Sequence, residues 1–180
     1  MLSIVAVVLV VLIAAFAIFA ATRPTEFRVS RSRTLAAPPE VVHAYVNDFH
    51  KWPEWSPWER LDPTMKKEVS GDPSGPGATY YWSGNSKAGE GRMTITDSRP
   101  PQSVTLRLEF MRPWKAVNTA QFDLVPSGTG SHLTWAMTGQ NNFMAKAFGV
   151  FMNLDKLVGA DFERGLASLD AATSGSARTR

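Results

Sequence analysis

The stretch SRTLAAPPEVVHAYVNDFHKWPEWSPWE, residues 32–59, contains the sharpest change of secondary structure in the chain. It begins inside a segment, 26–36, whose apolar and polar side chains alternate as in a strand with one buried face. Two prolines and a glutamate at 38–40 end that strand and favour the first turn of a helix. Apolar residues then recur with helical spacing over 41–49, which predicts an amphipathic helix of about three turns.

Three tryptophans follow this helix at every third position, namely Trp52, Trp55 and Trp58. A spacing of three places them on one face of a short 3₁₀-like turn. Glu54 and Glu59 interrupt the stretch, which argues against a patch that meets a membrane. We therefore expect Trp52 and Trp55 to close one end of the core, and Trp58 to contact a ligand.

In the remainder of the chain the hydrophobic period changes twice. Alternation with period two, broken by Gly/Pro-rich turns, predicts an antiparallel meander with one buried face. Helical spacing returns over 143–172 and predicts one long C-terminal helix. Because a curved sheet with one buried face needs a cover, we predict an α+β domain whose sheet wraps this helix. The expected strands are 26–36, 65–70, 78–84, 89–99, 104–110, 116–125 and 133–138.

Residues 2–21 form an uninterrupted apolar segment in which Ser3 is the only polar residue. A helix of this length spans about 30 Å, the thickness of the hydrocarbon core of a bilayer. A cleavable signal peptide is the alternative, with the small residues of 17–21 near a candidate cleavage site. The lack of Lys or Arg before the apolar run, and its length, favour an uncleaved single-span anchor.

The chain accordingly divides into three predicted segments. Residues 1–22 form a transmembrane helix, and 23–173 have the length of one domain with a single core. Residues 174–180 contain no apolar residue larger than alanine, so we expect a disordered tail there.

Charge distinguishes the segment after the apolar helix from the rest of the chain. Four of the 19 Lys and Arg residues and one of the 16 Asp and Glu residues lie in 22–35, which leaves 15 of each sign elsewhere. A nucleic-acid binder concentrates basic residues on its folded domain, so we expect no nucleic-acid partner. The positive-inside rule predicts a cytoplasmic domain. A periplasmic or extracellular domain is the alternative.

The sequence contains none of the motifs that identify common enzymes or metal sites. Without cysteine, disulfides, zinc–thiolate sites and cysteine nucleophiles are excluded. Neither a nucleophile elbow nor a P-loop is present. His43, His50 and His132 are not spaced to share one ion. We expect no metal site and no cofactor.

Aromatic and methionine side chains give the strongest chemical signal, because six of them share the inward parity of the predicted strands. They are Tyr80, Trp82, Met93, Phe110, Trp135 and Met137. Such adaptable side chains suit an apolar pocket, and they equally suit a filled core. Asn118, Arg31 and Arg33 share the inward parity, and a buried polar group needs a partner, either a protein group or a ligand oxygen.

The passage 32–59 and the order of elements resemble the SRPBCC superfamily, which includes START-like and polyketide cyclase/dehydrase-like proteins. The matching residues are Ala37-Pro38-Pro39-Glu40-Val41-Val42, followed by Asp48 and the tryptophans from Trp52 to Trp58. The similarity covers 26–172. It implies a helix-grip fold with a cavity between the sheet and the C-terminal helix that holds lipids, sterols, polyketides or other apolar molecules. The N-terminal apolar helix is not part of the family pattern.

Two functional hypotheses follow from this resemblance. The first is a membrane-anchored, non-catalytic module that binds a lipid, an isoprenoid or a polyketide-like molecule. The residues that we expect to contact this ligand are Trp55, Trp58, Tyr80, Trp82, Met93, Phe110, Asn118, Trp135, Met137 and Phe162.

The second hypothesis is an enzyme of the polyketide cyclase/dehydrase type that acts in the same cavity. In it Tyr80 would donate a proton or hydrogen bond in enolate chemistry, with Asn118 or Arg31 in support. We favour the non-catalytic module, because a soluble cyclase has little reason to be anchored in a membrane. A third hypothesis is a structural partner protein with a filled core.

Overall fold

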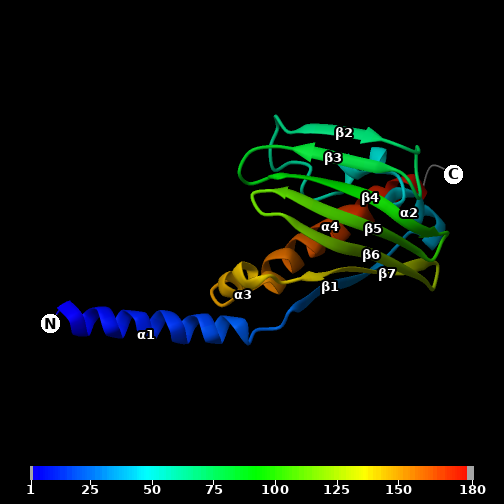
Figure 1. Cartoon of the computed structure of the whole chain (residues 1–180). Helices are drawn as coiled ribbons and strands as arrows, with labels where there is room; N and C mark the ends of the chain where they lie inside the picture. Colours follow the sequence, from blue (N-terminus) through cyan, green and yellow to red (C-terminus); the bar gives the residue numbers. More distant parts are fainter. Residues whose placement is uncertain (1, 178–180) are drawn as a thin grey trace.

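The computed structural model describes residues 2–177, and it describes side chains over 4–175. Seven antiparallel strands form one sheet in the order β1-β7-β6-β5-β4-β3-β2, and the sheet curves around helix α4 (Leu154–Ala177) (Figure 1). The predicted α+β helix-grip fold is therefore confirmed. The strands are β1 (Glu26–Leu35), β2 (Lys66–Ser70), β3 (Thr79–Ser83), β4 (Glu90–Arg99), β5 (Ser103–Arg112), β6 (Ala116–Ser127) and β7 (Gly130–Gln140).

The sheet is a meander that is closed by its first strand. From β2 to β7 each strand pairs with the next one in the sequence. Strand β1 pairs with β7 from Glu26 opposite Gln140 to Leu35 opposite Ser131. Alternation along each strand then directs one row of side chains toward α4 and the other row away from it.

Two helical elements follow β1, as the opening passage predicts, but the first ends at Val46 instead of Phe49, and of the three tryptophans only Trp52 lies within the second. Helix α2 (Pro39–Val46) begins with proline in its first turn, and the 3₁₀ helix η1 (Phe49–Glu54) follows it. The Asp48 carboxylate caps η1, because it accepts a hydrogen bond from the His50 backbone N–H at 2.9 Å. These elements cover the end of the sheet that carries the β4–β5 and β6–β7 turns (Figure 1). We call this the closed end.

The single helix expected over 143–172 is in fact two helices, so that prediction was wrong in its start. Helix α3 (Phe143–Gly149) precedes α4, and each has its own asparagine cap. Asn142 accepts a hydrogen bond from the Ala145 backbone N–H at 2.8 Å, and Asn153 accepts one from the Lys156 N–H at 3.0 Å. Capping at Asn153 starts a new helix in the middle of the apolar pattern. Helix α4 extends to Ala177, and residues 178–180 of the expected tail lie outside the described residues.

Helix α1 (Leu2–Ala21) extends away from the domain and lies beside α3 where it meets the domain (Figure 1). Its segment Ile4–Ala21 is long and apolar enough to cross a membrane, and nearly all of it is exposed. A signal sequence near an N-terminus has the same features. We call the end of the sheet near α3, with its β3–β4 and β5–β6 turns, the open end.

Candidate ligand site

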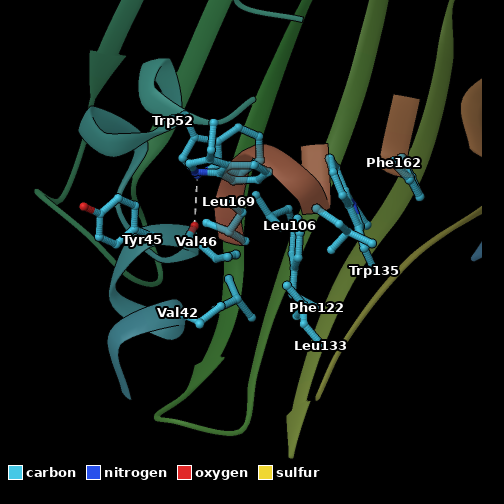
Figure 2. Close-up of a cluster of buried hydrophobic side chains, with 14 of the residues drawn as sticks. Val42, Tyr45, Val46, Trp52, Leu106, Phe122, Leu133, Trp135, Phe162 and Leu169 are labelled. Atoms are coloured by element: carbon cyan, nitrogen blue, oxygen red, sulfur yellow. Dashed lines mark hydrogen bonds between the residues drawn. The ribbon is translucent and has the colours of Figure 1, made fainter. Parts of the chain in front are cut away.

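Aromatic side chains fill the space between the sheet and α4 toward the closed end (Figure 2). Trp52 and Trp55 are each only 2% exposed, and the Trp52 indole N–H donates a hydrogen bond to the Val46 carbonyl at 3.0 Å. The Trp135 ring stacks on Phe162 with ring centroids 4.1 Å apart. Dense packing of this kind stabilises the fold and leaves no space for a ligand there.

Trp58 lies at the edge of this aromatic cluster and is only partly buried. Its ring makes edge contacts with Trp135 and Phe162, at centroid distances of 5.4 and 6.1 Å. Its indole N–H donates a hydrogen bond to the Asp161 carboxylate of α4 at 3.3 Å. Trp58 thus joins the segment after η1 to the helix. Its predicted contact with a ligand stays a prediction.

Two buried indole N–H groups have no hydrogen-bond partner within the part of the chain that the structure describes. They belong to Trp55 and Trp135. An unpaired buried donor costs about 1–3 kcal/mol, so such groups call for a physical explanation. Other aromatic rings hold both side chains in place, since Trp55 makes edge contacts with Phe122 and Trp135, and Trp135 stacks on Phe122 and Phe162.

A buried carboxylate, Glu59, holds the hydroxyl of Tyr80. Tyr80 donates to Glu59 Oε1 at 2.6 Å, and Lys67 Nζ lies 2.5 Å from Glu59 Oε2. Burial and the neighbouring Glu59 carboxylate both raise the pKa of Tyr80. Strand parity could not identify Glu59, because it lies outside regular strands and helices.

Arg31 faces α4, as its parity predicts, and carboxylates of the helix engage its charge. Its guanidinium lies 3.0 Å from Asp155 and 2.8 Å from Glu163. The Arg31 hydrogen bond lowers the pKa of Asp155, and both carboxylates raise the pKa of Arg31. Gly159 permits this approach, because an added Cβ there would lie 2.0 Å from Arg31 Nη2. Arg33 pairs likewise with Asp170 at 3.5 Å.

Asn118 is 8% exposed and faces inward on β6. Its amide nitrogen lies 3.9 Å from the Met137 sulfur, a weak hydrogen bond. Its amide oxygen lies against Gly139, where an added Cβ would approach it to 2.1 Å. Gly139 therefore makes room for the Asn118 side chain in the core.

Burial of the inward-facing residues decreases from the closed end to the open end. On β4, Ile95 is fully buried and Met93 is partly exposed. On β5, Leu106 is fully buried, while Leu108 and Phe110 are partly exposed. Two more half-buried residues, Phe27 of β1 and Val158 of α4, pack against the core from neighbouring elements. The concave face is thus packed at one end and an accessible apolar surface at the other.

A cavity of about 400 Å³ lies at the open end, around the β5–β6 turn. The residues that line it are Glu109, Phe110, Met111, Lys115, Ala116 and Val117. A second cavity, of about 200 Å³, lies between the segment after η1 and α4 and is bordered by Trp55, Arg60 and Arg164 among others.

The ten predicted ligand contacts therefore occupy different places. Phe110 borders the first cavity and Trp55 borders the second. Five belong to the buried core cluster, away from both cavities: Tyr80, Trp82, Trp135, Met137 and Phe162. Met93 and Trp58 are partly buried and pack against this cluster, and Asn118 is a buried polar residue beside it. Among the described residues, no group of three or more His, Asp or Glu side chains is placed to hold a metal ion.

The sequence profile of the family described as polyketide cyclase / dehydrase and lipid transport matches residues 26–173. A sequence search of curated proteins gives no match.

Several solved structures share the fold of this chain at low sequence identity. Protein CV1439 from Chromobacterium violaceum is similar with a TM-score of 0.59 at 16% identity, over 84% of this chain and 98% of that one. Ara h 8.0201 is similar with a TM-score of 0.55 at 13% identity, over 86% and 99%. The di-domain ARO/CYC StfQ from the steffimycin biosynthetic pathway is similar with a TM-score of 0.60 at 12% identity, over 85% of this chain and 52% of StfQ.

Proposed function

Because this chain belongs to the polyketide cyclase/dehydrase and lipid transport family, we propose that it is a membrane-anchored module that binds an apolar small molecule at the open end of its sheet. The ligand would be a lipid, an isoprenoid or a polyketide-like molecule. The domain would hold it against the concave face without changing it.

The observation that carries this proposal is the decrease of burial along the inward-facing rows. Met93, Leu108 and Phe110 face the interior, yet each keeps part of its surface exposed. Covering that surface with an apolar ligand contributes roughly 25 cal/mol per Å² of apolar area. Asn118, deeper on the same face, has an amide that meets only weak partners and is suited to a ligand carbonyl or hydroxyl.

The membrane anchor rests on α1. Its apolar segment Ile4–Ala21 is 18 residues long and makes few contacts with the domain, so a bilayer is the environment that would solvate it. We propose a single span with the domain in the cytoplasm, from the basic residues of 22–35. A reporter that is active only outside the cytoplasm, fused to the C-terminus, tests the orientation. Activity of that reporter would contradict it.

The contacts of the candidate catalytic residues favour binding over cyclase or dehydrase chemistry. The Tyr80 hydroxyl already donates to Glu59, and the charge of Arg31 is engaged by Asp155 and Glu163. A proton donor for a substrate enolate needs a free, aimed hydrogen. In this arrangement both groups hold the fold together.

Native mass spectrometry of the full chain in detergent tests the proposal, with a fluorescent fatty acid as the added probe. Leu108→Trp would fill the space over the open end and should reduce probe retention at least tenfold. Val125→Trp is the matched control, because Val125 is 55% exposed on the outer face, and it should leave retention unchanged. Asn118→Leu should also weaken retention.

A chain that carries no co-purified ligand and exchanges no apolar probe would contradict the proposal. It would support instead a structural role for a filled core. Unchanged retention in Asn118→Leu would assign Asn118 to structure alone.

A further inference from the structure

We propose that α3, the segment 150–157 and the exposed Trp114 form a docking surface that lies on the bilayer spanned by α1. This inference rests on the proposed membrane anchor and extends it from α1 to the domain itself. It also specifies the source of the ligand, which is the lipid phase of that bilayer.

Large apolar side chains are exposed together on this surface. Helix α3 contributes no buried residue to the domain. Phe151 is 76% exposed and Trp114 is 64% exposed. Contiguous exposed apolar surface of this kind identifies an interaction site. The other exposed members are Phe143, Met144, Phe148, Met152, Leu154 and Leu157.

Ring contacts connect the surface from the sheet to α1. Trp114, in the β5–β6 turn, contacts Phe148 of α3 with ring centroids 6.0 Å apart. Phe151, just after α3, stacks on Phe16 of α1 with centroids 5.7 Å apart. Lys146 of α3 donates to the Thr25 hydroxyl at 3.0 Å, close to the end of α1. The docking surface is therefore continuous with the proposed span.

The position of Phe16 gives the depth of this surface. Phe16 lies five residues before Ala21, where α1 ends, which corresponds to about 8 Å along the helix axis. Amphipathic helices at a membrane surface bury their apolar face roughly 5–10 Å into the lipid boundary. With α1 across a bilayer, Phe151 would lie at that depth. Acyl chains surround α1 at this level, so a bilayer is the occupant that fits the surface.

Charge around the docking surface complements a membrane that contains anionic lipid. Arg23, Lys115, Lys146 and Lys156 lie on or beside it in the sequence and the fold. Asp155, an acidic residue of the same region, is paired with Arg31. Tryptophan is favoured where apolar and polar layers of a membrane meet, as Trp114 would be.

The docking surface adjoins the open end, which has a consequence for the ligand. Lys115 lines the 400 Å³ cavity, and its neighbour Trp114 belongs to the docking surface. An apolar molecule that enters this cavity from the lipid phase does not have to cross water. We therefore infer a ligand that is dissolved in the bilayer.

The natural chain has no cysteine, so single cysteines can be placed and spin-labelled without a background. The full chain is reconstituted in nanodiscs that contain anionic phospholipid, with labels at Phe148→Cys and Phe151→Cys. Val8→Cys reports on α1, and Thr129→Cys in the β6–β7 turn is the aqueous control. We expect labels at 8, 148 and 151 to be relaxed mainly by oxygen, and the label at 129 mainly by a water-soluble nickel chelate.

The outcomes separate the docking surface from the anchor. Aqueous access at 148 and 151, with lipid access at 8, overturns the docking surface and leaves the anchor in place. Aqueous access at 8 overturns the anchor. Labels at 148 and 151 that neither reagent reaches would overturn bilayer docking in favour of a second copy of the chain.

Uptake of ligand tests the inferred source. The double variant Phe148→Glu and Phe151→Glu should slow transfer of a fluorescent fatty acid from anionic vesicles at least tenfold, with retention of preloaded probe unchanged. Val125→Glu adds a charge on the outer face of the sheet and should not slow transfer. Unchanged uptake in the double variant would overturn entry from the bilayer.

Discussion

The closed and open ends of the sheet are built from the same kinds of residue but use them differently. At the closed end, Trp52, Trp55 and Trp135 are almost completely buried. At the open end, Trp114 is 64% exposed, and Phe148 of α3 is also exposed. An aromatic side chain thus packs in the core at one end and remains exposed at the other. Under the proposed function, stability and binding would be separated along the length of the strands.

The largest expected difference between the two ends is in their contribution to stability. Trp135→Ala removes a ring that is stacked on Phe162 and Phe122, so it should lower the free energy of unfolding by about 3–5 kcal/mol. Trp114→Ala should change it by less than about 0.5 kcal/mol. Urea denaturation of both variants in detergent measures the difference. Equal losses would refute the distinction between the ends.

Trp135→Phe is a conservative control for this prediction. It keeps an aromatic ring and removes the unpaired indole N–H. Because an unpaired buried donor is itself unfavourable, Trp135→Phe should lower the free energy of unfolding by less than about 1.5 kcal/mol. A larger loss would mean that this N–H has a partner in solution.

A second variant defines how far the packed core reaches toward the open end. An added Cβ at Gly91 would lie 2.4 Å from the Trp82 ring and 2.5 Å from the Glu109 carbonyl. Gly91→Ala should therefore destabilise the domain by about 1–3 kcal/mol. Gly128→Ala would not serve as a control for this variant, because Gly128 has a positive φ that alanine rarely adopts. Gly149→Ala is the matched control, since an added Cβ at Gly149 meets nothing within 4 Å. It should leave the free energy of unfolding nearly unchanged.

The Tyr80 hydroxyl should make a smaller contribution. Tyr80→Phe removes its hydrogen bond to buried Glu59, while Lys67 still pairs with that carboxylate. We expect the free energy of unfolding to fall by about 1–2 kcal/mol. Tyr81→Phe removes a hydrogen bond to the less buried Glu90 and should lose less. Equal losses would show that burial of the hydroxyl does not matter.

The smallest effect concerns pH and the closed end. Burial lowers the pKa of His43, whose ring lies 3.2 Å from the Ser98 hydroxyl. The unfolded chain therefore takes up a proton at His43 at higher pH than the folded chain, near pH 6.5. Stability is full above that pH and decreases below it. We expect Tm to fall by about 2 °C more in the natural chain than in His43→Gln between pH 7.5 and 5.5. An equal fall of Tm in both proteins would contradict the assignment of this pH dependence to His43.

Local signals in the sequence predicted most of the fold. Alternation placed the strands within a few residues of their observed bounds, because each strand of the meander has one buried face. The proline pair before Glu40 correctly indicated the start of α2. The predicted start of the C-terminal helix was wrong, because an apolar pattern does not distinguish side chains that pack in the core from side chains that stay exposed. Asn153 is a helix-capping signal that could have identified the break.

The inward parity of Arg31 and Asn118 followed from the sequence, but their partners did not. Asp155 and Glu163 are more than 120 residues away from Arg31 in the chain, and only the packing of α4 on β1 brings them together. The same holds for Glu59 and Tyr80, which come from an irregular segment and a strand.

By itself, the sequence determined the α+β architecture and the apolar N-terminal helix, because both depend on local periodicity and composition. The family and its helix-grip fold followed from the resemblance of the passage 32–59 and of the element order. The tertiary structure alone decided that Trp114, Phe148 and Phe151 are exposed while Trp135 and Phe162 are packed. That difference depends on how far α4 and η1 cover each row of the sheet, and coverage is a property of the whole fold. For the passage 32–59, this means that Trp52 and Trp55 lie in the core, while Trp58 lies at its edge against α4.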